Sequence, residues 1–203
     1  ERRMQHREKE NSNWFGISKI DEEKQTSIRS SFDMISSDLS MTPHIILEFR
    51  SSEFIGPNAF AIPGGIIIIT DEMIELSQSW EEVLAILAHE LGHVEQRHSM
   101  RMLVQNSFAT LVATAVTADA ASLSAAVAGV PVLLIQKKYS RNFETMADQF
   151  AFDLLRHHGL SPEAFADIME RIEANQDTRK PISFLSTHPL TAERIKRARD
   201  KNR

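Results

Sequence analysis

The stretch "VLAILAHELGHVEQRHS", from Val83 to Ser99, places two histidines and a glutamate inside an apolar run. In a helix of about 3.6 residues per turn, His89 and His93 lie one turn apart on the same face, so both imidazoles can bind one metal ion. Glu90 follows His89 directly and can reach a water molecule on that ion. The pattern therefore predicts a zinc ion and a glutamate general base, which together perform hydrolysis.

A catalytic zinc ion takes three protein ligands and keeps one position open, so a third ligand must come from another part of the chain. The longer metzincin motif HExxHxxGxxH, which adds a third histidine ligand, is absent. Gln96 and Ser99 stand where that motif needs a glycine and a histidine. We expect His98 to be solvated, since it lies half a turn away from the face of His89. Asp119 stands in an Ala-rich stretch with no supporting motif.

The better source of a third ligand is "SRNFETMADQFA", residues 140–151. Glu144 and Asp148 share one helix face there among apolar neighbours. Two carboxylates so placed repel each other unless a positive group holds them. Both are satisfied if Glu144 binds the metal ion and Asp148 accepts the second N–H of a ligand histidine. The alternative is an exposed acidic stripe.

The stretch "STHPLTAERI", residues 186–195, adds His188 and Arg194. His188 precedes Pro189, which favours an extended backbone and leaves the imidazole free to reach a neighbouring site. It can fill the fourth metal position in a latent resting enzyme or donate to the oxyanion of a bound substrate; a surface histidine that caps the last helix is the alternative. Arg194 can steady an acidic ligand or the oxyanion, although a solvated basic face explains it nearly as well.

Several elements must position these side chains. Ser79 with Glu82 is a capping-box signature for the helix that carries the first motif, and Thr70 begins a short helix before it. Further helices are predicted at 140–158, closed by Gly159, then at 161–175 and from Thr191 to the basic end.

The first half of the chain supplies the scaffold. Sparse apolar spacing over residues 17–39 predicts an amphipathic helix, preceded by a frayed start at 1–12. The runs "HIILEFR" and "GGIIIIT" predict short strands of a small sheet. Between them, "IGPNAFAIPGG" is rich in Gly and Pro and predicts an irregular edge element.

Composition narrows the class of protein. We expect one domain over residues 1–203, because a chain of 203 residues suits a single core. A net charge of −5 argues against nucleic acid as a partner, and the absence of cysteine leaves His, Asp and Glu to hold any metal ion.

One long apolar segment, Phe108 to Ile135, is broken by Asp119 and by Gly129 and Pro131. Neither half reaches the roughly 18 apolar residues that a membrane span needs. We expect an apolar helical hairpin or lid at 108–135 that can contact a membrane surface; insertion into a membrane is the alternative. The chain begins without an initiator Met, so an upstream anchor can have been removed.

Four stretches in this order, "NAFAIPGG", "AHELGHVEQRH", "SRNFETMADQFA" and "STHPLTAERI", resemble the membrane-associated gluzincin peptidases. That family includes CAAX prenyl endopeptidases, HtpX heat-shock proteases, Oma-type proteases and the beta-barrel assembly-enhancing protease. The resemblance covers most of the chain from about Phe54 onward, and the chain looks most like the compact bacterial members.

The resemblance implies an α+β, mainly helical fold, a zincin-type metallopeptidase domain with a small sheet packed on the HExxH helix. It gives Glu144 the third-ligand position and Asp148 the supporting one. Among the members, the assembly-enhancing protease favours His188 as the resting fourth ligand, and others favour the oxyanion role. The family's substrate chain runs antiparallel along an edge element that here would be Asn58, Ala59, Phe60 and Ala61. An ordinary loop is the alternative for that segment.

We therefore expect a zinc-dependent endopeptidase with one Zn²⁺ ion that hydrolyses misfolded or membrane-associated polypeptides in envelope quality control. The alternative is a zinc-bearing, chaperone-like binding module with latent or lost proteolysis. Glu90 favours the enzyme, because a pure binding module does not need that carboxylate. The resemblance implies a location in the bacterial periplasm or cell envelope; the sequence does not indicate the oligomeric state.

Overall fold

The computed structural model describes residues 14–37, 39, 44–117, 138–175 and 184–200, with the backbone alone over 108–117. In chain order the elements are β1 (Gly16–Ile17), α2 (Glu22–Ser36), β2 (Ile46–Ser51), β3 (Ala59–Ile62), β4 (Ile66–Thr70), α3 (Asp71–Leu76), α4 (Trp80–Glu95), α5 (His98–Thr117), α8 (Arg141–His157), α9 (Glu163–Ala174), α10 (Phe184–Thr187) and α11 (Ala192–Arg199). The mainly helical α+β prediction is confirmed.

The sheet has the strand order β1-β2-β4-β3. β2 and β4 are parallel and correspond to the two β-branched runs, while β3 pairs antiparallel with β4. Ala59 lies opposite Ile69, and Ala61 lies opposite Ile67. The Pro-flanked segment therefore forms an edge strand within the described part of the chain, as its composition predicted.

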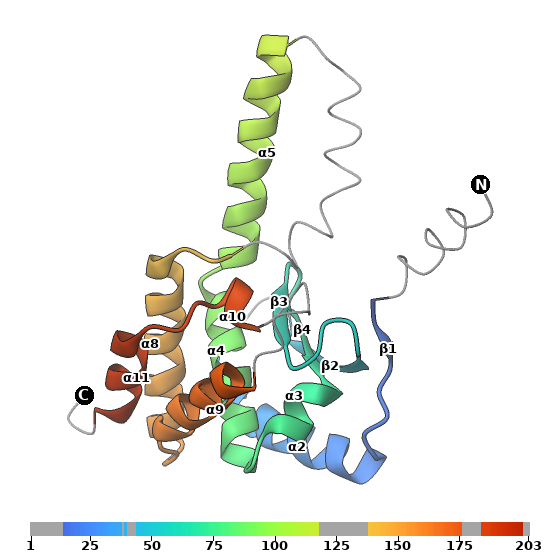
Figure 1. Cartoon of the computed structure of the whole chain (residues 1–203), viewed down its shortest axis with the longest axis vertical. Coiled ribbons are helices and arrows are strands. Elements are labelled where there is room, and N and C mark those ends of the chain that lie inside the picture. The colour runs from blue at the N-terminus through green and yellow to red at the C-terminus, as the bar shows by residue number, and fades with distance from the viewer. Residues whose placement is uncertain (1–13, 38, 40–43, 118–137, 176–183, 201–203) are drawn as a thin grey trace.

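Helix α4 lies between the sheet on one side and α8, α9 and α11 on the other (Figure 1). Every residue from Glu82 to His93 is buried, because α4 packs against α2, α8, α9 and β3 together. Ser79 caps its start by accepting from the Glu82 N–H at 3.3 Å. The Glu82 carboxylate accepts from the Gln78 N–H at 2.8 Å, one residue earlier than in the predicted capping box.

Helix α8 packs along α4 and carries the second predicted motif. Ser140 caps it by accepting from the Phe143 N–H, and Gly159 ends it with a positive φ of 71°. Its inward face is apolar apart from Glu144 and Asp148, which are both buried. Exposure of these two carboxylates, the alternative to a metal site, is therefore excluded.

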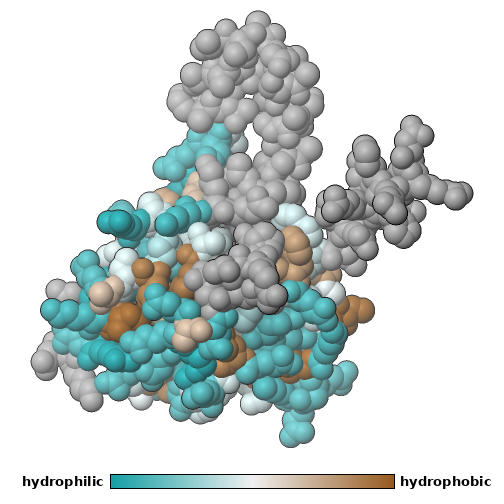
Figure 2. All heavy atoms as spheres, in the orientation of Figure 1, coloured by the Kyte–Doolittle hydropathy of each residue, from teal (hydrophilic) through white to brown (hydrophobic). Residues whose placement is uncertain are grey.

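Hydrophilic residues cover most of the described surface on the face that Figure 2 shows. Helix α5 projects away from the other described elements (Figure 1) and exposes Met100 and Val104 near its start. Among the described residues, no helix is both long and apolar enough to cross a membrane. The predicted frayed start at 1–12 and residues 118–135 of the predicted hairpin lie outside the described residues; residues 108–117 end α5.

Helix α4 lies tightly against α8 at Gly92, inside the HELGH motif. A Cβ atom there would lie 2.9 Å from the Ala147 carbonyl oxygen and 3.0 Å from its Cα. Both contacts are too short, so a side chain at this position must push the two helices apart. The glycine thus holds the histidines of α4 next to the carboxylates of α8.

Gly92→Ala should lower the free energy of unfolding by about 1–3 kcal/mol, the usual cost of overpacking a core. Urea denaturation of both proteins measures this difference. Gly16→Ala is the matched control, because a Cβ at Gly16 would lie 3.6 Å from the Ser51 carbonyl oxygen, an ordinary contact. Equal stability of wild type and Gly92→Ala would mean that the helices are not in close contact there.

Candidate metal centre

Four buried side chains from three segments converge at one point. His89 and His93 come from α4, Glu144 from α8, and His188 from the residue after α10. One ligand atom from each lies within 4.8 Å of all the others. All four were predicted from the sequence as candidate ligands, and the structure brings them together.

The distances between these donor atoms are similar. His89 Nε2 lies 3.1 Å from His93 Nε2, 3.3 Å from His188 Nδ1 and 3.5 Å from Glu144 Oε2. Glu144 Oε1 lies 3.4 Å from His93 Nε2 and 3.2 Å from His188 Nδ1. Ligands about 2.0–2.1 Å from a tetrahedral zinc ion stand roughly 3.3–3.4 Å from one another, so the donor set fits zinc.

Asp148 lies directly behind His89. Its Oδ1 is 3.0 Å from His89 Nδ1, which leaves Nε2 of that imidazole to face the other donors. Arg194 donates to Asp148 through Nε at 2.8 Å and through Nη2 at 2.7 Å. Arg197 Nη2 donates to the same carboxylate at 2.8 Å. Asp148 therefore fixes the orientation of one candidate ligand and is itself held by two arginines.

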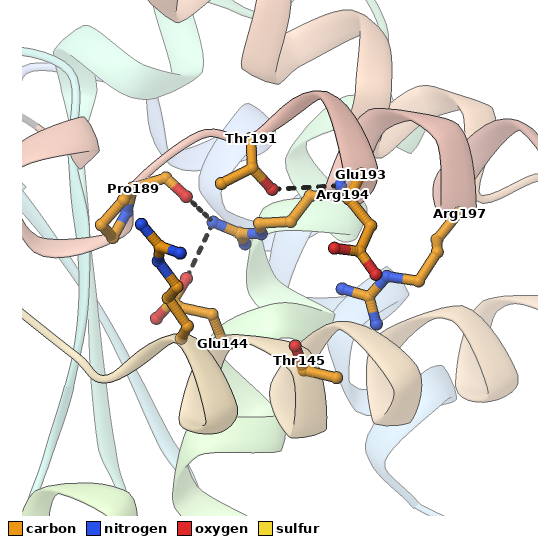
Figure 3. A pocket seen from close by; sticks show the side chains of 8 residues that line it. Glu144, Thr145, Pro189, Thr191, Glu193, Arg194 and Arg197 are labelled. Carbon is orange, nitrogen blue, oxygen red and sulfur yellow. Dashed lines mark hydrogen bonds and ion pairs between the residues drawn. The ribbon is translucent and has the colours of Figure 1, made fainter.

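Arg194 is 4% exposed, so the solvated basic face considered for it is excluded. Its Nη1 lies 2.8 Å from Glu144 Oε2 and donates to the Pro189 carbonyl at 2.8 Å. Figure 3 shows it pointing from α11 across to Glu144, at the wall of a pocket of about 230 Å³. Arg194 was expected to steady either an acidic ligand or the oxyanion. The structure places it against Glu144, the acidic ligand candidate.

The surroundings set the protonation of the donors. Burial lowers the pKa of His89, but hydrogen bonding to Asp148 and Glu144 raises it more, to about 9. Burial also raises the pKa of Glu144, yet the charge and hydrogen bond of His188 hold it well below its usual range. Burial lowers the pKa of His93 well below its usual range. A cation that binds here displaces the proton from His89 and meets an ionised Glu144 and a neutral His93.

Glu90 lies beside the donors and is completely buried. Neither of its carboxylate oxygens makes a hydrogen bond of good geometry in the described part of the chain, although His188 Nε2 lies 3.4 Å from Oε1 and the Ala61 backbone N–H approaches the carboxylate closely enough to lower its pKa. Burial raises the pKa of Glu90, against the opposing effect of His188 and His89. A buried carboxylate without well-placed donors is costly, which indicates that a ligand or water supplies them.

The prediction that His98 is solvated is wrong. His98 is fully buried, and its Nδ1 lies 3.0 Å from His93 Nδ1. The prediction assumed one continuous helix, but α4 ends at Glu95 and Arg97 has a positive φ of 54°. This left-handed residue turns the chain so that the first residue of α5 faces back to His93.

His188 is 1% exposed, so it is not the surface histidine considered as an alternative. The cap of α11 is Thr191, whose side chain accepts from the Arg194 N–H. The His188 N–H donates to the Phe184 carbonyl at 2.8 Å, and the two rings stack with centroids 4.4 Å apart. These contacts hold its Nδ1 toward the donors.

Of the four residues predicted to bind substrate, Asn58 directly precedes β3 and the other three belong to it. Asn58 is buried, and it is fixed by its N–H, which donates to Thr70 Oγ1, and by its carbonyl, which accepts from the Thr70 N–H. Ala59, Phe60 and Ala61 belong to the strand, and β3 packs against α4. The edge strand therefore runs beside the helix that carries His89 and His93.

Sequence reasoning missed Tyr139 and Ser99. The Tyr139 ring stacks on the His93 ring with centroids 4.0 Å apart, and its hydroxyl lies 2.9 Å from Ser99 Oγ. Tyr139 stands one residue before the quoted "SRNFETMADQFA" and is the only tyrosine in the chain. Its position next to the segment that carries Glu144 was the only indication in the sequence that Tyr139 belongs to the site.

Several known proteins are similar to this chain. Metalloprotease LoiP of Escherichia coli (strain K12) is 30% identical over 148 residues, which make up 71% of this chain and 58% of LoiP. Mitochondrial metalloendopeptidase OMA1 of Schizosaccharomyces pombe is 30% identical over 165 residues, 79% of this chain and 46% of OMA1. The beta-barrel assembly-enhancing protease of Yersinia pestis is 29% identical over 157 residues, 71% of this chain and 32% of that protein.

The chain thus spans little more than half of LoiP and less of the other two relatives. The model of peptidase family M48 matches residues 23–202, which is nearly the whole chain. The four donors and the buried glutamate all lie inside this matched region, and the match agrees with the family resemblance seen in the motifs. The chain belongs to peptidase family M48.

Proposed function

We propose that the protein is a zinc-dependent endopeptidase that cleaves misfolded or membrane-associated polypeptides. One observation carries the proposal: the orphaned carboxylate of Glu90 lies beside four donor atoms whose spacing fits tetrahedral zinc. Family membership supports the same reaction class. A binding module would need the donors and would have no use for a buried, unpartnered Glu90.

His89, His93 and Glu144 would hold the zinc ion. When bound, zinc lowers the pKa of a water molecule toward about 7 and polarises a peptide carbonyl. Glu90 acts as the general base: it takes the proton of the attacking water and passes it to the leaving amine. Burial raises the pKa of Glu90 towards neutral pH. A carboxylate with a pKa near the working pH can both accept and return a proton.

The supporting residues keep the donors in one arrangement. Asp148 orients His89, and Arg194 balances the charges of Asp148 and Glu144. His188 can occupy the fourth position at rest, because its Nδ1 lies at ligand distance from the other donors. On binding of substrate it would move away and give its place to the water molecule. A resting enzyme blocked by His188 would bind polypeptides without cleaving them. The chaperone-like alternative would then be the latent state of the same enzyme.

Substrate would bind as an added antiparallel strand along β3, residues 59–62. Backbone hydrogen bonds at a strand edge give affinity with little sequence preference, which suits misfolded polypeptides. One relative is named for enhancing β-barrel assembly, and we extend from it a role in envelope quality control and a location in the bacterial periplasm or cell envelope. Residues 1–203 would act as one catalytic domain, with the 108–135 segment as an apolar lid or membrane-surface contact.

Glu90→Gln should retain zinc and lose roughly 100-fold to 10,000-fold in kcat, because the ligands survive and the general base does not. Metal content by mass spectrometry and cleavage of unfolded casein measure the two effects. Glu95→Gln, on the same helix but exposed, is the matched control. Full activity of Glu90→Gln would disprove the mechanism.

Glu144→Ala should weaken zinc binding by more than roughly 100-fold, which is the largest effect usual for residues that only support a ligand. Competition with a chromophoric chelator gives the affinity. Asp153→Ala removes an exposed carboxylate from the same helix and should bind zinc as the wild type does. If Glu144→Ala keeps wild-type affinity, Glu144 is not a ligand.

His188→Ala should raise basal peptide cleavage while zinc stays bound, because the variant no longer blocks the fourth position. Initial rates at equal zinc occupancy test this, with the exposed His44→Ala as control. A lower rate with zinc retained would contradict the resting-ligand role and assign His188 to oxyanion stabilisation. An unchanged rate would remove it from both roles.

A further inference from the structure

Tyr139 contacts two parts of the metal centre at once. Its ring stacks on His93 at an interplanar angle of 27° and lies 5.2 Å from the His188 ring, centroid to centroid. Its backbone N–H donates to the Thr187 carbonyl at 3.0 Å, directly before His188. At 6% exposure, Tyr139 is packed on every side. It is therefore fixed relative to two of the four donors.

The hydroxyl of Tyr139 begins a chain of hydrogen bonds that ends at the edge strand. Ser99 Oγ donates to the Ala61 carbonyl at 2.6 Å. Because Ser99 has one hydroxyl hydrogen, its oxygen must accept from Tyr139, which lies 2.9 Å away. A phenol holds its proton at neutral pH, so Tyr139 can supply this hydrogen. The chain thus runs from Tyr139 through Ser99 to β3.

The carbonyl at the end of this chain belongs to the free edge of β3. In an antiparallel pair, successive residues turn their backbone groups alternately toward and away from the partner strand. The Thr70 N–H donates to the Asn58 carbonyl at 3.0 Å, so Asn58 faces β4. By alternation Phe60 also faces β4, and Ala59 and Ala61 face away from it. Ser99 therefore holds one of the edge groups that an added substrate strand would lie against.

We propose that Tyr139 is a positioning residue that, through Ser99, holds the β3 edge at a fixed distance from His93 and so selects which peptide bond is cleaved. This inference rests on the proposed endopeptidase function. A substrate strand that slips by two residues keeps the same side chains facing the same way, so backbone pairing alone does not fix its register. A rigid spacing between the edge strand and the metal-binding histidine presents one bond to the site.

The distribution of cleavage sites in one unfolded polypeptide tests this role. Tyr139→Phe keeps the ring that stacks on His93 and removes only the hydroxyl. The share of the main cleavage product should fall at least about 2-fold, and cuts two residues away should rise, because the strand register loosens. Ser99→Ala should give the same redistribution, and the double variant no more than either single one.

Ser51→Ala is the matched control, because Ser51 of β2 is also buried, and its hydroxyl donates to Glu72 of α3. Loss of folded protein would lower all products equally and leave their ratios unchanged. Product ratios identical to those of the wild type in Tyr139→Phe and Ser99→Ala would overturn the proposal. If the wild type cleaves nothing, the endopeptidase proposal fails by itself.

Amide hydrogen exchange provides a readout that needs no activity. In Tyr139→Phe and Ser99→Ala, the segment 58–62 should exchange about 5-fold faster than in wild type, as the loss of one hydrogen bond predicts. Ser51→Ala should leave exchange in that segment unchanged. Wild-type exchange of 58–62 in both variants would overturn the tether between Tyr139 and β3, whether or not the protein is a peptidase.

Discussion

Two carboxylates buried side by side on α8 are the constraint on which the rest of the site depends. Glu144 and Asp148 are at most 2% exposed, and ionised groups in such a place need positive partners. Arg194 contacts both, and His89 lies against both from the opposite helix. The charge is balanced only when α4, α8 and α11 meet, so the folded core and the metal centre form together.

The local parts of this arrangement could be predicted from the sequence. His89 and His93 one turn apart, and Glu144 and Asp148 one turn apart, each follow from helix periodicity, and the caps at Ser79 and Ser140 mark where the helices begin. The β-branched runs likewise indicated β2 and β4. Patterns of this kind arise within one helix or strand, where the separation of two residues in the sequence determines whether they lie on the same face.

Two parts of the site that depend on a turn or on long-range contacts could not be predicted. His98 was placed on the wrong face because nothing in the sequence indicates that Arg97 adopts a left-handed conformation. Tyr139, Ser99 and Ala61 meet although 78 residues separate the first from the last, and no periodicity connects them. The result is that the edge strand and the candidate metal centre are joined by Tyr139 and Ser99, two residues to which no motif assigns a function.

We propose that one zinc ion is held by the histidines of α4, Glu144 and, at rest, His188. X-ray absorption spectroscopy of the protein loaded with one equivalent of zinc tests it directly. Four nitrogen or oxygen ligands are expected at about 2.0–2.1 Å, with the scattering signature of three imidazoles. His188→Ala should lose one imidazole. A spectrum of hydrated zinc, or of a site without imidazole, would contradict the claim.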